Sequence, residues 1–150
     1  MTTTAIRPHA IGAPGYSETW PCEAESVSRA RSLVSAAIST WGLSHLIDDG
    51  TLVVSELVTN AVQHTDCSQV RVSITLTLRQ RVRIAVSDRS IDLPEPNLVE
   101  DGAGDEEAGR GLLLVELLAD YWDVKLHRWG KTVWADLLTV EADRFAEGDA

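Results

Sequence analysis

The feature that most constrains the fold of this chain is a change of hydrophobic period at Ser68. Before this residue, apolar side chains recur every three or four positions, which is the period of an amphipathic helix. After it, apolar and polar side chains alternate, which is typical of a strand with one buried face. Helices and strands in separate runs predict an α+β fold rather than repeated βαβ units.

The same patterns predict individual elements. The first helix covers about 27–41 and ends at Gly42, and the second begins at Ser44 as its N-cap and reaches about His64. The rest of the chain is predicted to hold strands at 70–78, 82–86, 121–126 and 132–138 and a helix at 111–119. We expect a two-layer α/β sandwich, with a mixed, mostly antiparallel sheet that carries its helices on one face.

The length of 150 residues suits one domain. We expect a flexible N-terminus at 1–15, a folded domain at 16–140 and an acidic flexible tail at 141–150. The net charge of -10 repels nucleic acid and anionic membranes, and no run of Lys or Arg offsets it, so we expect neither as a partner. No apolar stretch is long enough to span a membrane. Cys22 and Cys67 are too few for a disulfide scaffold, which predicts reduced thiols and a cytoplasmic location.

Glu56 and Asn60 form the first candidate site. Their spacing places both on one face of the second helix, and His64 continues that face. An amide oxygen is a hard ligand for Mg²⁺, and a carboxylate can orient or deprotonate a nucleophile. The alternative is a solvated helix face, where Glu and Asn at this spacing are common.

Asp88 forms the second candidate, because it ends an apolar strand where a long loop begins. A carboxylate there can accept a hydrogen bond from an amino group of a planar ligand. A strand-ending Asp that caps the following turn is an equally good interpretation.

The segment Gly109-Arg110-Gly111 forms the third candidate, immediately before a predicted helix. Bare backbone N–H groups at a helix N-terminus can bind a phosphate, and glycine lets the anion approach closely. A hinge is the alternative. Gly130-Lys131-Thr132 is not a P-loop, because Lys125 stands where that motif needs a glycine.

The order of these segments resembles the GHKL (histidine-kinase-like) ATPase superfamily and, within it, the small bacterial anti-sigma factors that are serine/threonine protein kinases. The residues that carry the resemblance are Glu56-Leu-Val-Thr-Asn60, Val86-Ser-Asp88, Gly109-Arg110-Gly111-Leu and Gly130-Lys131-Thr132-Val. The resemblance spans about 20–138 and implies the Bergerat-type ATP-binding fold.

The resemblance also implies roles, ligands and partners. Asn60 is similar to the Mg²⁺-coordinating Asn, Glu56 to the acidic residue that activates the attacking hydroxyl, and Asp88 to the Asp that recognises adenine. Gly109 and Gly111 resemble the phosphate glycines under a mobile lid, with Arg110 and His64 next to the nucleotide, and Thr132 resembles a hydroxyl residue near adenine. ATP and Mg²⁺ are the implied cofactors. An anti-sigma factor antagonist is the implied substrate, with a sigma factor as a second partner and a homodimer as the assembly.

Two features depart from the family pattern. Asp88 is followed by Arg89, Ser90, Ile91 and Asp92, so both glycines of the Asp-x-Gly-x-Gly motif are absent. The segment 91–109 carries seven acids and no Lys or Arg, and negative charge near a triphosphate is unfavourable. A protein-interaction module of the same fold that binds ATP weakly or not at all is therefore the alternative function.

Overall fold

A computed structural model describes residues 5–6, 14–64, 68–77, 80–89 and 113–139. The described elements are β1 (Ala5–Ile6), β2 (Gly15–Pro21), α1 (Glu25–Thr40), a 3-10 turn (Ser44–Leu46), α2 (Ile47–His64), β3 (Gln69–Leu76), β4 (Arg81–Arg89), β5 (Tyr121–His127) and β6 (Gly130–Leu138). Residues 113–118 are also helical. The helices and strands predicted from hydrophobic period are therefore confirmed where the structure describes them. The predicted N-cap of the second helix is wrong, because Ser44 lies inside the 3-10 turn, whose N-cap is Leu43, and α2 begins only at Ile47.

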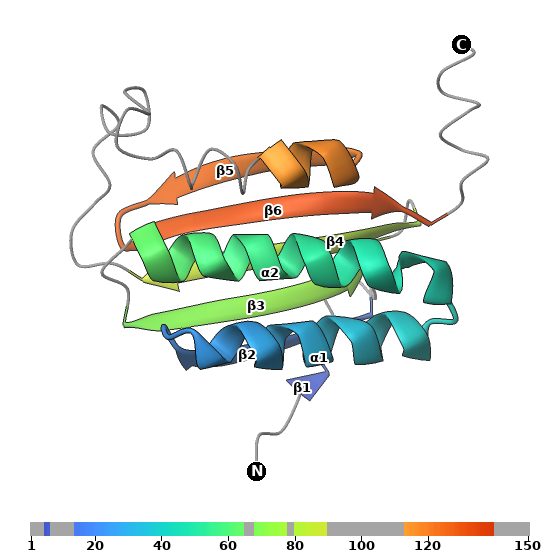
Figure 1. Ribbon diagram of the computed structural model, residues 1–150, viewed down its shortest axis with the longest axis horizontal. Coiled ribbons are helices and arrows are strands. Elements are labelled where there is room, and N and C mark those ends of the chain that lie inside the picture. Colours follow the sequence, from blue (N-terminus) through green and yellow to red (C-terminus); the bar gives the residue numbers. More distant parts are fainter. Residues whose placement is uncertain (1–4, 7–13, 65–67, 78–79, 90–112, 140–150) are drawn as a thin grey trace.

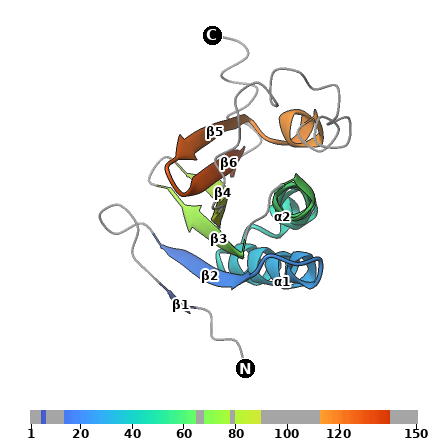
Figure 2. The same cartoon turned by 90° about the vertical axis from the view of Figure 1, so that its left-hand side faces the viewer.

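The strands form a single sheet in the order β1-β2-β3-β4-β6-β5 (Figure 1). Every pairing between described strands is antiparallel. Figure 2 shows α1, α2 and the short helix at 113–118 on the same side of this sheet. The expected α+β two-layer sandwich with helices on one face is confirmed, and no parallel pair of the expected mixed sheet occurs among the described strands.

The two long helices pack tightly against each other and against the sheet. Gly50 of α2 makes this possible, because a Cβ there would lie 2.7 Å from Ile38 Cδ1 of α1. The chain leaves α1 at Gly42, whose φ of +71° suits glycine. The largest fully buried side chains come from both layers: Ile38, Ile74, Ile84, Leu137, Val34, Val53, Val54, Val58, Val70, Val72, Val82 and Val86. Burial of this aliphatic surface between helices and sheet is the main source of stability.

The strand β2 was not predicted from the sequence. Its alternation is weak because Glu18 stands between Tyr16 and Trp20 on the face that looks toward α1. Pairing with β3 in register from Gly15 to Pro21 supplies the hydrogen bonds that the local pattern does not reveal.

The expectation of reduced cysteines is wrong for Cys22, which is disulfide-bonded. The cause is tertiary, because the pairing of β2 with β3 brings the Cys22 N–H within 3.1 Å of the Ser68 carbonyl oxygen. Cys67 lies outside the described residues.

No helix in the described part of the chain is both long and apolar enough to cross a bilayer. The predicted boundaries at 15/16 and 140/141 remain predictions. Most of 1–13 and all of 140–150 lie outside the described residues, although Ala5–Ile6 pair with β2.

Candidate functional site

Asp88 is a buried carboxylate at the end of β4. The strand alternates, and its core positions Val82, Ile84 and Val86 are followed on the same face by Asp88, whose exposed fraction is 2%. Burial raises the pKa of the Asp88 carboxyl, whereas the positive charge of Lys131 and a hydrogen bond from the Lys131 backbone N–H lower it. The fold thus places a costly charge under the helices and partly compensates it with one cation.

Asn60 of α2 is linked to Asp88 through Lys131, the cation that acts on the Asp88 carboxyl. It is a buried polar residue, 9% exposed, on the helix face that also carries the core residues Val53 and Leu57. Its Oδ1 lies 3.4 Å from Lys131 Nζ of β6, which donates to it. Glu56, one helical turn earlier, is half-buried. Asn60 therefore lies on the buried side of α2, and the Glu56–Asn60 pair is not simply part of a solvated helix face.

Lys131 completes the cluster and was not predicted from the sequence. It is the cross-strand neighbour of Asp88 in the β4–β6 pair. The alternation of β6 could have identified Lys131 as a residue on the inner face of the sheet. Val133, Ala135 and Leu137 are buried on that face, and Lys131 precedes them at the same two-residue period. We call Asn60, Asp88 and Lys131 together the Asp88 site.

Gly130 lets β6 approach Asp88. Its φ is +154°, and a Cβ at this position would lie 2.0 Å from the Asp88 carbonyl oxygen. No side chain tolerates such a contact, so the close approach of the two strands at the Asp88 site depends on glycine.

Thr132 lies on the face of the sheet opposite to Asp88, and its implied role near adenine stays a prediction. It follows Lys131 on β6 and therefore points to the opposite face of the sheet, where its Oγ1 lies 2.8 Å from Ser87 Oγ. His127 Nε2 lies 2.9 Å from the same hydroxyl oxygen. The two-residue period of a strand separates Thr132 from Asp88.

The remaining predicted residues are not placed. Gly109, Arg110 and Gly111 lie outside the described residues, as does the acidic segment 91–109. His64 is the last residue of α2, and only its backbone belongs to the described part. Their roles stay predictions.

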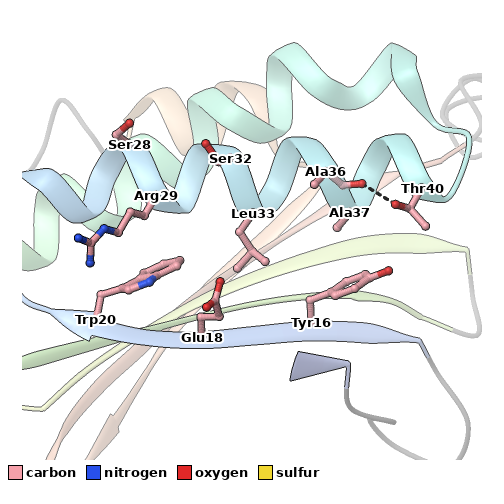
Figure 3. A pocket seen from close by; sticks show the side chains of 10 residues that line it. All are labelled: Tyr16, Glu18, Trp20, Ser28, Arg29, Ser32, Leu33, Ala36, Ala37 and Thr40. Atoms are coloured by element: carbon pink, nitrogen blue, oxygen red, sulfur yellow. Dashed lines mark hydrogen bonds between the residues drawn. The ribbon is translucent and has the colours of Figure 1, made fainter. Parts of the chain in front are cut away.

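A separate hollow lies between β2 and α1, away from the Asp88 site. Figure 3 shows Tyr16, Glu18 and Trp20 on β2 facing Leu33 on α1 across this space, which has a volume of about 370 Å³. The Trp20 side chain is buried, and its Nε1 has no hydrogen-bond partner among the residues that the structure describes. None of the residues lining this hollow belongs to the Asp88 site.

The family model described as Histidine kinase-like ATPase domain matches residues 20–137, which is most of the chain. This protein belongs to that family.

One comparison with a solved structure agrees with this fold. The RsbU and RsbW domains of Rv1364c from Mycobacterium tuberculosis are similar with a TM-score of 0.64 and 21% identity, over 83% of this chain and 32% of that chain. This protein thus spans about a third of that neighbour's length. The histidine kinase domain from the Erythrobacter litoralis EL346 blue-light activated histidine kinase has a TM-score of 0.48 and 20% identity, over 78% of this chain and 60% of that chain. A search of curated proteins finds no match.

Proposed function

We propose that this protein binds ATP with Mg²⁺ at the Asp88 site and acts as a serine/threonine protein kinase of the anti-sigma type. Its substrate would be a hydroxyl of an anti-sigma factor antagonist, and a sigma factor would be a second partner. Family membership supports ATP as the ligand. The observation that carries the proposal is the buried Asp88 carboxylate, 2% exposed, together with Lys131, whose charge acts on Asp88 and whose Nζ lies 3.4 Å from Asn60 Oδ1.

Asp88 would recognise adenine. An ionised carboxylate accepts hydrogen bonds and does not donate them, so it selects a ring that offers an amino group. The Lys131 charge favours this ionised form against the effect of burial. The orientation of Asp88 is fixed by its strand, which keeps the acceptor in place before a ligand arrives.

Asn60 would hold Mg²⁺. The ion is usually bound by one or two protein oxygens together with phosphate oxygens and water, and the buried Asn60 Oδ1 is a suitable hard donor. The donor set therefore fits the metal. When bound, Mg²⁺ would neutralise phosphate charge, which is the main electrostatic requirement of phosphoryl transfer.

Glu56 would position or deprotonate the attacking hydroxyl from the preceding helical turn. Gly109, Arg110, Gly111 and His64 would lie beside the phosphates. Lys131 takes a place in the proposed site, because its ammonium is within reach of Asn60 and its charge acts on Asp88.

The test of the proposed site is Asn60→Ala against a matched control. Gln63 lies on the same helix, carries a carboxamide and is exposed, so Gln63→Ala removes the same kind of group outside the site. Calorimetric titration with ATP should show Mg²⁺-dependent binding for the parent protein and Gln63→Ala, and none for Asn60→Ala, while circular dichroism shows all three folded. Equal ATP affinity in Asn60→Ala would refute the site.

Phosphoryl transfer needs its own experiment. The protein is incubated with ATP labelled at the γ-phosphate and a candidate antagonist protein, and the product is analysed for phosphoserine and phosphothreonine. Label on the antagonist that is absent with Glu56→Gln supports the kinase. ATP binding without any transfer to a panel of antagonists contradicts it.

One observation favours a second function, a regulatory binding module without phosphoryl transfer. The Lys131 ammonium lies 3.4 Å from the oxygen that would coordinate Mg²⁺, so a built-in cation already faces that oxygen. Such a module would bind the nucleotide equally well with and without Mg²⁺ and would leave the antagonist unmodified. The same calorimetric titration, with and without the metal, distinguishes the two functions.

A further inference from the structure

The outer face of the sheet is not covered by any described helix, since α1 and α2 lie on the other side (Figure 2). Its side chains are those that alternate with the core positions of each strand. On β3 and β4 they are mainly hydroxyl-bearing or cationic: Arg71, Ser73, Thr75, Arg81, Arg83, Ser87 and Arg89. A sheet face of this composition is suited to a polar partner.

The cations at one end of this face are already paired. Arg83 Nε lies 2.7 Å from Asp136 Oδ1, and Arg81 Nη1 lies 4.0 Å from Asp136 Oδ2. Both guanidinium groups also lie over aromatic rings, Arg81 over Tyr121 and Arg83 over Trp134. At this end, both arginines are therefore engaged by the Asp136 carboxylate and by an aromatic ring.

The other end is a groove of about 630 Å³ that contains Arg71 and Arg89, and none of the described residues that line it is acidic. Arg71 makes a long hydrogen bond of 3.4 Å to Ser17 Oγ. Arg89 makes no ion pair within the part of the chain that the structure describes. Both side chains are exposed. Arg71 pairs with Ser87 and Arg89 with Gln69, so the two arginines are diagonal neighbours on adjacent strands, with Cα atoms about 7–8 Å apart.

An aromatic wall borders this groove. The rings of His127 and Trp129 stack at a centroid distance of 4.3 Å and an interplanar angle of 10°. The hydrogen bonds from His127 through Thr132 to Ser87, at 2.9 and 2.8 Å, anchor the wall to the sheet. Trp129 is 42% exposed, which leaves part of its ring free for an apolar side chain.

We propose that this groove docks an acidic segment of a partner protein. Each guanidinium offers a planar fork that matches a carboxylate, and two neighbouring forks match two nearby acids. The hydroxyl groups between them suit a peptide backbone, and the Trp129 ring suits an apolar residue beside the acids. The groove lies on the opposite face of the sheet from the Asp88 site, so this proposal does not depend on ATP binding.

The charges favour a protein segment over nucleic acid. The chain as a whole carries -10, which repels a polyanion at long range. Nucleic-acid sites commonly neutralise about 6–10 phosphates, whereas this groove offers two arginines. A short segment with two or three acidic residues can pair with the two arginines, and the net negative charge of the protein repels it less than it repels a polyanion.

The proposal is tested by panning a library of random short peptides against the full-length protein, without nucleotide. Three proteins are compared: the parent, the double variant Arg71→Gln/Arg89→Gln, and Arg31→Gln, which removes an exposed arginine from α1 on the other side of the sheet. Peptides selected by the parent and by Arg31→Gln should be enriched in Asp and Glu. The double variant should lose this enrichment and should bind a selected peptide about tenfold more weakly in fluorescence anisotropy.

A folding control and a Trp129 variant complete the test. Thermal unfolding verifies that the double variant is folded, and Trp129→Ala should weaken the selected peptide while both arginines remain. Selected peptides without acidic enrichment, or equal binding by the double variant, would overturn the proposal. Tighter binding of a labelled single-stranded oligonucleotide through the same two arginines would overturn the choice of a protein partner. Failure of ATP binding would refute only the proposed function, since no nucleotide is present here.

Discussion

Gly130→Ala should damage both the fold and the Asp88 site. The added Cβ would lie 2.0 Å from the Asp88 carbonyl oxygen, and the φ of +154° is unfavourable for alanine. A positive φ costs about 1–2 kcal/mol in a residue with a side chain. Relief of the contact requires the backbone of β4 or β6 to move, and overpacking of this kind costs about 1–3 kcal/mol more. We therefore expect a loss of about 2–5 kcal/mol in the free energy of unfolding.

Gly42→Ala provides the matched control. Gly42 also has a positive φ, +71°, but a Cβ there would meet nothing within 4 Å. Its substitution should cost about 1–2 kcal/mol and leave ATP affinity unchanged. Urea unfolding of both variants measures the difference, which isolates the steric contact, and an ATP titration reports the displacement of Lys131. If Gly130→Ala is no less stable than Gly42→Ala, the close approach of β6 to Asp88 is refuted.

Two further predictions concern the charges of the Asp88 site. Because burial raises the pKa of Asp88, its contribution to stability is greatest at acidic pH below the ordinary carboxyl pKa and is lost as pH rises through the raised value. Asp88→Asn should therefore raise the thermal midpoint at neutral pH, flatten this pH dependence and abolish ATP binding; an unchanged pH profile would contradict the argument. Lys131→Met removes the cation of the Asp88 site and should lower ATP affinity about tenfold or more by calorimetry. Unchanged affinity would exclude Lys131 from the site.

The helices and most strands could be predicted because they depend on local periodicity. The alternation that ends at Asp88 identified β4, and the spacing of Glu56 and Asn60 identified a polar face on α2. The strand β2 was missed, since Glu18 interrupts the apolar row between Tyr16 and Trp20 and the pairing with β3 that stabilises it is not local.

The composition of the site was predictable only in part. Asp88 and Asn60 were selected individually, but Lys131 was passed over for its neighbour Thr132. One residue along a strand changes the face of the sheet, so Lys131 points to the Asp88 site and its neighbour Thr132 points to the outer groove.

The sequence by itself determined the fold class, the family and the candidate residues of α2 and β4. Hydrophobic period and the order of motifs are local properties of the sequence, so they can be recognised without the tertiary structure. Tertiary structure alone decided which charges meet. Strand register brings Lys131 to Asp88 inside the sandwich and Arg71 to Arg89 on its outer face. A chain with a net charge of -10 and no basic run thus acquires a local basic groove, because side chains far apart in sequence become neighbours when strands pair.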